Sequence, residues 1–206
     1  MPILTVLSLV ALCADPADTG WTEAAKEDGV TVYSRDKEGS SVKEMRAIGV
    51  IDGTPQAVWA ALRDYPNYTK TMPYTEESRV ISVEDGGKVT YFYSLVNAPL
   101  VDRRDYTLKI VDDSDWKDGK GFMKSTWTIS DKGPPEKESP VRVKINDGYW
   151  KLEARDGGKK TFATYYVYTD PGGSLPKWVA NKANSIAVPN VFGAIRKVIE
   201  KGKAAP

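Results

Sequence analysis

The sequence of 206 residues contains no histidine. Histidine is the side chain that titrates near neutral pH, and it is the commonest metal ligand in proteins. Catalytic triads that depend on an imidazole, and zinc sites built from histidine, are therefore excluded. Cysteine is almost as scarce, because Cys13 is the single one in the chain. A domain that begins after this residue can have neither a disulfide nor a thiol nucleophile.

An excess of charge of one sign is also lacking, since 29 basic residues face 28 acidic ones and leave a formal net charge of +1. Nucleic-acid-binding domains usually carry a basic face, whereas the two signs are interspersed here. We therefore expect no nucleic-acid partner. The chain has no low-complexity tract and no linker. At this length, with 41% hydrophobic residues, it is expected to form one globular domain over residues 21–201.

The apolar run over residues 3–12 is too short to span a bilayer. Its length fits the core of a signal peptide, so we expect residues 1–14 to be removed on export to the periplasm or the extracellular space. Two alternatives stay open. Because no basic residue precedes Ile3, the segment could remain unprocessed in a cytoplasmic protein. Cleavage before Cys13 would permit lipid attachment there, although Leu12 is large for that position.

The rest of the chain is predicted to be rich in strands. Alternating, β-branched or aromatic segments predict strands over residues 31–35, 42–51, 79–83, 88–96, 105–111, 122–130, 141–147, 149–154 and 160–169. Glycine-containing pairs at 86–87, 118–119, 147–148 and 157–158 predict hairpin turns between them. Because strand follows strand without an intervening helix, the sheet is expected to be largely antiparallel.

Two helices are predicted beside prolines. Thr54 is expected to cap a short helix over residues 56–62, with Pro55 at its first position. A long closing helix is expected over residues 178–201, after Pro176, because apolar residues recur there every three or four positions. Its middle carries small side chains, which are expected to leave space beneath it, and Pro189 is expected to kink it. The fold class is therefore α+β.

Strand alternation predicts which side chains face this helix. Leu108 and Ile110 share a face with Tyr106, and the same parity turns Arg104 inward and Asp105 outward. Residues 91, 93 and 95 form one face of the preceding strand, and residues 123, 125, 127 and 129 form one face of the following strand. Residues 150 and 152 alternate with charged neighbours and are expected to point inward. The strand that contains Tyr165 is aromatic on both faces, so its parity is open.

Three separated motifs resemble the START (StAR-related lipid-transfer) domain of the SRPBCC/helix-grip superfamily. They are the run Pro-Leu-Val-Asp-Arg-Arg-Asp-Tyr at 99–106, the strand start Gly-Tyr-Trp at 148–150, and Asp-Pro-Gly-Gly at 170–173 leading through Pro-Lys-Trp at 176–178 into the closing helix. The resemblance implies a helix-grip fold, in which a curved antiparallel sheet wraps the long C-terminal helix and encloses a hydrophobic tunnel. It also implies that one sterol, phospholipid or similar lipid is carried by a monomer, with transient membrane contact, no cofactor and no chemistry.

Carried onto this chain, the resemblance places Arg104 and Asp105 where the family has an Arg-Asp pair at the start of a central strand. We expect Arg104 to be partly buried and paired, either in a structural ion pair or as a polar anchor for a ligand head group. Some sterol-carrying members have charged residues in the tunnel at the positions of Tyr91 and Ile110, which are uncharged here. Tunnel polarity is therefore expected to come from tyrosine hydroxyls. The candidate ligand-binding residues are Tyr91, Tyr93, Leu95, Arg104, Leu108, Ile110, Trp127, Trp150, Tyr165 and Ile186.

Other interpretations stay open. The aromatic residues could be ordinary core residues, and the domain could have a protein-binding or structural role. An enzyme of the polyketide cyclase or aromatase type would need acid and base groups in the pocket, and parity predicts no inward pair of carboxylates. No metal site is expected, because the acidic run 112–119 has Lys117 at a required ligand position of a calcium loop. A lipid carrier would need a mobile gate, for which residues 64–74 and 97–102 are the candidates.

Overall fold

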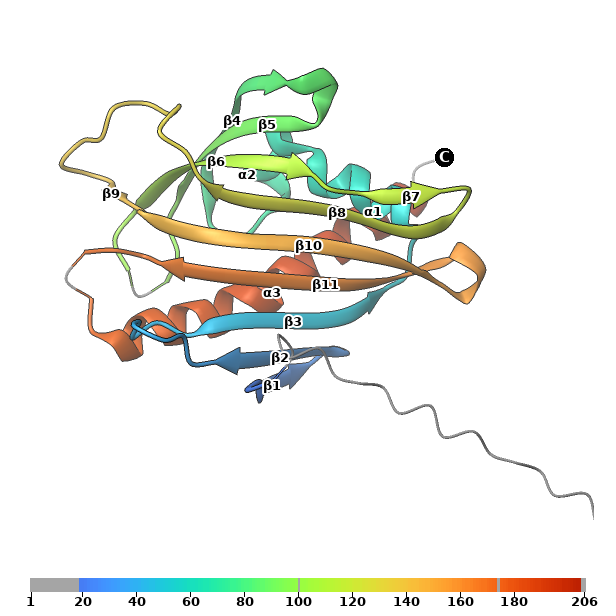
Figure 1. Ribbon diagram of the computed structural model, residues 1–206, viewed down its shortest axis with the longest axis horizontal. Helices are drawn as coiled ribbons and strands as arrows, with labels where there is room; N and C mark the ends of the chain where they lie inside the picture. Colours follow the sequence, from blue (N-terminus) through green and yellow to red (C-terminus); the bar gives the residue numbers. More distant parts are fainter. Residues whose placement is uncertain (1–18, 100, 174, 205–206) are drawn as a thin grey trace, which may run out of the picture.

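The computed structural model describes residues 19–99, 101–173 and 175–204. The predicted signal peptide, with Cys13, lies outside the described residues. In the described part of the chain, eleven strands form one sheet, and α3 lies against one of its faces (Figure 1). The strands are β1 Thr22–Glu27, β2 Val30–Arg35, β3 Glu44–Ile51, β4 Thr75–Glu84, β5 Val89–Val96, β6 Arg104–Asp112, β7 Asp115–Lys117, β8 Lys120–Ile129, β9 Val141–Arg142, β10 Ile145–Arg155 and β11 Lys160–Asp170. The helices are α1 Pro55–Arg63, α2 Tyr68–Thr71 and α3 Lys177–Ala204, with single 3-10 turns η2 Tyr65–Asn67, η3 Asp85–Gly87 and η4 Asp156–Gly158.

The main path of the sheet runs in the order β1-β2-β3-β11-β10-β8-β6-β5-β4, with β7 paired to β8. Each pairing along this path is antiparallel, and the two-residue β9 runs parallel to β6. The order places β11, the last strand in sequence, between β3 and β10, so the chain leaves the middle of the sheet to enter α3 (Figure 1). The predicted α+β class, with a largely antiparallel sheet and a closing C-terminal helix, is confirmed.

The turns follow the glycine signals with one exception. Asp-Gly-Gly at 85–87 and at 156–158 closes two hairpins, and in each the Asp has a positive φ of 50° and 52°. Asp118 and Gly119 form the turn between β7 and β8, so part of the acidic run is itself a strand. The predicted turn at 147–148 is wrong, because both residues lie inside β10.

α1 begins as its sequence predicts. The Thr54 hydroxyl accepts a hydrogen bond from the Ala57 amide at 3.2 Å, and Pro55 occupies the first turn. Just before the cap, Gly53 lies so close to α3 that an added Cβ would be 2.7 Å from Cγ2 of Ile199. The absence of a side chain at this position therefore lets the C-terminal part of α3 pack against the start of α1.

α3 covers the inner face of the sheet from the β2–β3 side to α1 (Figure 1). With 28 residues it is about 42 Å long. Phe192 and Ile195 of this helix are fully buried and pack in the main core with Ile51, Val58 and Leu152. Pro189 lies inside the helix, and the kink expected there stays a prediction. Within the described residues, no helix is both long enough and apolar enough to cross a membrane.

Candidate functional site

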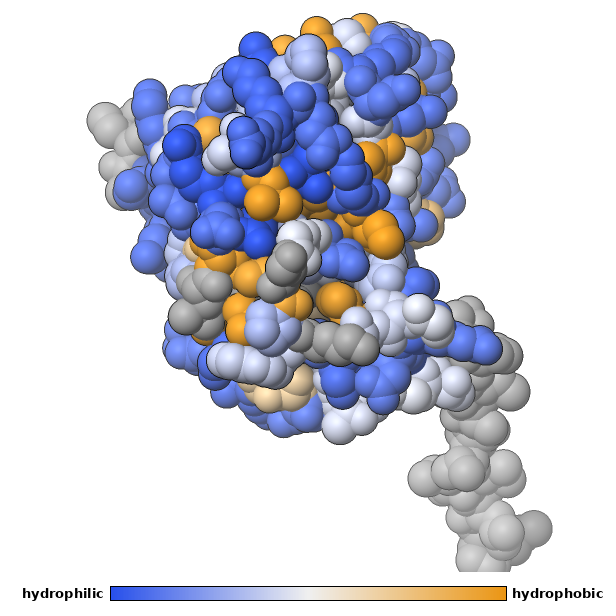
Figure 2. All heavy atoms as spheres, turned by 90° about the vertical axis from the view of Figure 1, so that its left-hand side faces the viewer, coloured by the Kyte–Doolittle hydropathy of each residue, from blue (hydrophilic) through white to orange (hydrophobic). Residues whose placement is uncertain are grey.

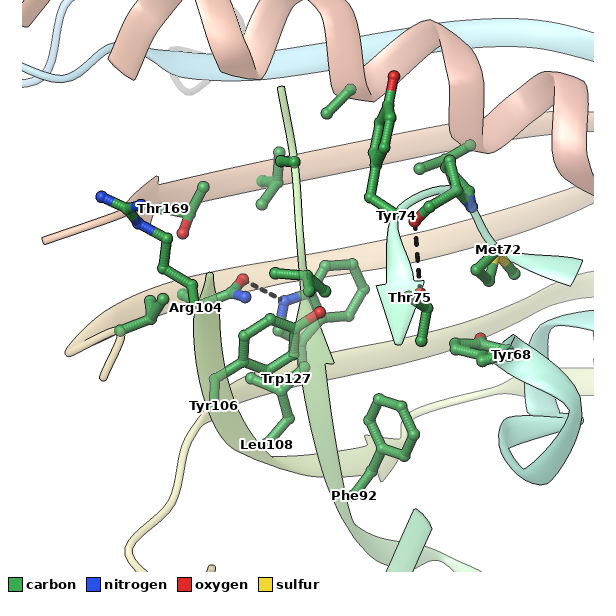
Figure 3. Close-up of a pocket in the computed structure, with 18 of the residues that line it drawn as sticks. Tyr68, Met72, Tyr74, Thr75, Phe92, Arg104, Tyr106, Leu108, Trp127 and Thr169 are labelled. Carbon is green, nitrogen blue, oxygen red and sulfur yellow. Dashed lines mark hydrogen bonds between the residues drawn. The ribbon is translucent and has the colours of Figure 1, made fainter. Parts of the chain in front are cut away.

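A cavity of about 270 Å³ lies between the inner face of the sheet and α3 (Figure 3). β5, β6, β8, β10 and β11 supply the wall on the sheet side, whereas α3 and the segment 64–74 supply the opposite side. Its lining is aliphatic and aromatic with few polar groups. The lining residues are Leu62, Tyr65, Tyr68, Met72, Pro73, Tyr74, Thr75, Phe92, Val96, Ala98, Val101, Arg104, Tyr106, Leu108, Ile110, Ser125, Trp127, Val143, Asn146, Trp150, Tyr165, Val167, Thr169, Pro171, Ala187, Val188 and Val191.

Six of the predicted site residues meet in this cavity, and all lie on the sheet. They come from four strands, β6, β8, β10 and β11, so only the sheet register brings them together. Ile186 is half-buried on α3 and is not part of the lining, whereas its neighbours Ala187 and Val188 are. The six are Arg104, Leu108, Ile110, Trp127, Trp150 and Tyr165. That these six bind a ligand stays a prediction.

The expectation that Tyr91, Tyr93 and Leu95 face the helix is wrong. In the β5–β6 register Phe92 pairs with Leu108, and both line the cavity. Tyr91, Tyr93 and Leu95 are partnered instead by Lys109, Thr107 and Asp105, on the opposite face of the sheet.

The three residues are nevertheless buried, because the segment between β8 and β10, residues 130–144, covers the outer face of β5 and β6. The Lys132 ammonium lies 3.9 Å from the centre of the Tyr91 ring. An added Cβ at Gly133 would lie 1.9 Å from Oγ1 of Thr107, which shows how closely this segment approaches the sheet. β5 is therefore buried on both faces, and alternation of hydrophobicity could not indicate which face borders the cavity.

Trp127 and Gly148 are partners across β8 and β10, and they explain why residues 147–148 do not form a turn. The indole of Trp127 lies over Gly148, where a Cβ would be 2.3 Å from its Cζ2 atom. In this position the indole stacks on Tyr165 with ring centres 5.7 Å apart, and its Nε1 donates to Oδ1 of Asn146 at 3.1 Å. Glycine is thus required here to admit a large side chain and not to reverse the chain.

Trp150 connects the cavity to the core. Its ring lies 4.6 Å from that of Tyr165 and 5.1 Å from that of Phe192 on α3, measured between centres. It is 7% exposed. The two expectations for this residue, a ligand-facing side chain and a core aromatic, therefore both describe its position.

Arg104 is buried, as predicted, with 3% of its surface exposed, but it forms no ion pair with any described carboxylate. Its Nε donates to the Pro171 carbonyl at 3.3 Å, its Nη1 to the Asp102 carbonyl, and its Nη2 to the Gly172 carbonyl at 3.5 Å. Burial lowers the pKa of this guanidinium, and the charge of Asp102 partly opposes the shift. The predicted ion pair at Arg104 is therefore wrong.

Asp105 points to the outer face of the sheet, as parity predicts, and forms an ion pair there. Arg142 of β9 donates to it from Nε at 2.7 Å and from Nη2 at 2.9 Å, and the Tyr93 hydroxyl donates to it at 3.2 Å. The hydrogen bond to Asp105 raises the pKa of Arg142. This ion pair attaches the segment 130–144 to the outer face of the sheet, which the spacing along the chain could not predict.

Tyrosines supply much of the polarity of the cavity. Burial raises the pKa of Tyr68, Tyr106 and Tyr165, and it raises the pKa of Tyr65 to about 12. These hydroxyls are therefore neutral at pH 7, and they can donate hydrogen bonds but not act as bases. Tyr68 donates to the Leu62 carbonyl at 2.5 Å. In the described segments no group of three or more acidic or cysteine side chains could hold a metal ion.

Both candidate gates border the cavity. The segment 64–74 contributes five lining residues, and Figure 3 shows the side chain of its last residue, Tyr74, pointing toward α3. The Tyr74 hydroxyl accepts a hydrogen bond from Nδ2 of Asn190 on α3 at 2.7 Å. The loop 97–102 contributes Ala98 and Val101. That loop lies at the end of the molecule where α3 begins, and Figure 2 shows apolar surface gathered at this end. Trp178 at the start of α3 is 70% exposed.

Comparison with known proteins places this architecture in a family. The family described as polyketide cyclase / dehydrase and lipid transport matches residues 51–195. An uncharacterised protein of Pseudomonas aeruginosa is 30% identical over 182 residues, which cover 88% of this chain and 87% of that protein. The phosphatidylcholine transfer protein of Mus musculus is 27% identical over 183 residues, covering 86% of this chain and 85% of that one.

The crystal structure of a STAR-related lipid transfer protein fragment from Xanthomonas axonopodis superposes with a TM-score of 0.78 at 26% identity, over 88% of this chain and 99% of the fragment. The fold predicted from the three sequence motifs is therefore confirmed. The chain belongs to the polyketide cyclase / dehydrase and lipid transport family, and within it to the proteins with a START-type helix-grip domain.

Proposed function

We propose that this protein binds one lipid molecule in the cavity beneath α3 and transfers it between membranes without catalysing a reaction. The observation that carries the proposal is the largely apolar cavity between the sheet and the helix, on a fold shared with lipid-transfer proteins. Apolar surface removed from water contributes roughly 25 cal/mol per Å², so such a lining supplies affinity, while a few polar groups supply orientation.

The lining favours a carrier over an enzyme of the polyketide cyclase type. Among the described lining residues there is no aspartate, glutamate or lysine, and the ionisable groups are tyrosines and Arg104. Burial raises the pKa of the tyrosines for which a shift is resolved, and a general base needs a pKa near the working pH. The arrangement therefore provides hydrogen-bond donors without an acid–base pair.

Native mass spectrometry of the protein purified without detergent tests the proposal. We expect a stoichiometric added mass that solvent extraction identifies as a lipid. Ala187→Phe, which fills the cavity from α3, is expected to abolish the added mass, whereas Ala57→Phe on the exposed surface of α1 is expected to retain it. Wild-type protein that carries no lipid and takes up neither sterols nor phospholipids from vesicles would refute the carrier function. Turnover of a polyketide would favour the enzyme.

Transfer requires contact with a membrane, and we propose that the end carrying Trp178 makes it. Tryptophan favours the membrane–water interface, and this one is exposed at the start of α3. Trp178→Ala is expected to slow lipid transfer between vesicles several-fold while the affinity for the lipid is unchanged. Equal transfer rates for the variant and the wild type would show that another surface docks.

The proposed site of action is outside the cytoplasm, with the protein working as a monomer. The apolar run over residues 3–12 supports export. N-terminal sequencing of the protein from its native host, together with light scattering of the purified chain, tests both statements. A mature chain that retains residues 1–14, or a stable dimer, would contradict them.

A further inference from the structure

In the described part of the chain, the charged groups that line the cavity are of one sign only. Arg104 is the one lining residue, among those described, that carries a full charge at neutral pH, and no carboxylate lines the cavity with it. Its partners are the three backbone carbonyls of Asp102, Pro171 and Gly172, which are neutral. The Asp102 charge offsets the burial of this cation in part, so an anion that reaches the guanidinium from the cavity stabilises it further.

The guanidinium also has hydrogen-bonding capacity left. It carries five N–H groups in a planar fork, and three are directed at the carbonyls. The Nη2 contact with the Gly172 carbonyl is 3.5 Å long, so it is the weakest of the three. Two N–H groups remain for a ligand, and Arg pairs best with a planar or tetrahedral oxyanion that accepts two of them.

Asn146 adds further donors at the same end of the cavity. It is partnered by Thr169 across β10 and β11, and Figure 3 shows Thr169 beside Arg104. Because its Oδ1 accepts from Nε1 of Trp127, the amide is oriented, and its two Nδ2 hydrogens are the groups left to meet a ligand. Arg104 and Asn146 together therefore present hydrogen-bond donors.

The size of the cavity limits the apolar part of the ligand. A volume of about 270 Å³ lies just below the range of roughly 300–1,000 Å³ that holds drug-sized molecules. At about 10–15 Å³ of such volume for each water-sized group, it accommodates on the order of twenty heavy atoms. One acyl chain of moderate length fits these dimensions, whereas two long chains would require α3 or the segment 64–74 to move outward.

We infer that the ligand is a single-chain amphiphile with an anionic oxygen head group, a carboxylate or a phosphate monoester, held by Arg104 and Asn146 with its chain among Trp127, Leu108 and Phe92. This inference rests on the proposed carrier function and narrows it to one class of lipid. Arg104 and Asn146 select the head group by charge, and the aromatic wall receives the chain.

The test compares ligands that share a chain and differ in charge. Binding of dodecanoate, dodecyl phosphate, 1-dodecanol and dipalmitoyl phosphatidylcholine is measured by isothermal titration calorimetry or by quenching of tryptophan fluorescence. We expect at least one of the two anions to bind the wild type ten-fold or more tightly than 1-dodecanol, and the stronger of the two identifies the head group. Equal affinities for the anions and the alcohol would overturn the inference.

Asn146→Asp is the matched variant. Aspartate keeps the acceptor for Nε1 of Trp127 and leaves the carbonyl contacts of Arg104 in place, but it puts a negative charge in the donor group. We expect the affinity for the anion to fall ten-fold or more and the affinity for 1-dodecanol, which carries no charge, to fall by a smaller factor. Parallel losses for both ligands would mean that the variant damages the cavity and that charge does not select the ligand.

The outcomes separate this inference from the function on which it rests. Tight binding of dipalmitoyl phosphatidylcholine or a sterol, with no preference for the single-chain anions, would leave the carrier function standing and refute the ligand class. If none of these ligands binds, and the protein purifies without lipid, the carrier function itself fails.

Discussion

Replacement of Gly148 by alanine adds one methyl group at the closest contact in the wall of the cavity. The new Cβ would lie 2.3 Å from Cζ2 of Trp127 and 2.4 Å from the Tyr166 carbonyl oxygen. The carbonyl belongs to β11, which pairs with β10 along its whole length, so it cannot withdraw without breaking the sheet. Trp127 must therefore move, and the space open to it is the cavity.

The free-energy cost has three parts. Overpacking of a filled site costs about 1–3 kcal/mol. A displaced Trp127 also loses its hydrogen bond to Asn146, with a net value of about 1 kcal/mol, and its stacking on Tyr165, with a value of about 0.5–1.5 kcal/mol. We expect Gly148→Ala to lower the free energy of unfolding by about 3 kcal/mol, which for a domain of this size lowers Tm by about 6–12 °C.

Urea denaturation followed by circular dichroism measures this change, and Gly193→Ala is the control. Gly193 lies inside α3, and an added Cβ there has no heavy atom within 4 Å, so the substitution is expected to stabilise by about 0.5–1 kcal/mol through helix propensity. The two Gly-to-Ala changes thus have opposite expected signs. If Gly148→Ala unfolds within 0.5 kcal/mol of the wild type, the indole does not require the glycine and the packing argument is refuted.

Three further predictions concern the segment 64–74, the outer face of the sheet and a buried tyrosine. Tyr74→Phe removes the hydrogen bond to Asn190 that connects the segment 64–74 to α3. Stopped-flow fluorescence should therefore show that the variant releases ligand several-fold faster than the wild type. An unchanged release rate would exclude this segment as the gate. Arg142→Gln leaves Asp105 buried without its cation and should cost about 3–5 kcal/mol in urea denaturation, with partial recovery when Asp105→Asn is added. Because the pKa of Tyr65 is raised to about 12, its contribution to stability is complete below pH 10 and is lost as the pH rises towards 12. Tyr65→Phe should flatten this part of the pH–stability curve. An unchanged slope would contradict the raised pKa of Tyr65.

Local signals predicted most of the secondary structure. The cap at Thr54 and the turns at 85–87, 118–119 and 156–158 lie where short-range chemistry requires them, because the hydrogen bonds and backbone angles involved span only a few residues. The closing helix and the antiparallel order of the sheet also follow from periodicity and from the absence of helices between strands. β1 and β7 were missed, since one is mostly exposed and the other has three residues.

The candidate site was predicted in part. On strands with one solvent-facing side, such as the one containing Trp150 and Lys151, alternation identified the inner face correctly. On β5, where both faces are buried, the same reasoning selected Tyr91 and Tyr93 in place of Phe92. The two residues of the proposed head-group site differ in the same way. Burial of Arg104 was predicted from strand alternation. The position of Asn146 beneath Trp127 was not predicted, because it depends on the pairing between β8 and β10.

The sequence by itself determined the fold class, the terminal helix and the exclusion of imidazole chemistry, because each depends on composition or on interactions between neighbouring residues. The tertiary structure alone decided which face of β5 borders the cavity, where Asp105 finds its cation and why Gly148 lies within a strand. These features depend on contacts between segments distant in sequence: residues 130–144 cover the outer face of β5 and β6, Arg142 reaches Asp105 from 37 residues away, and Trp127 lies across Gly148. No local pattern encodes such contacts, because their geometry exists only once the sheet has assembled.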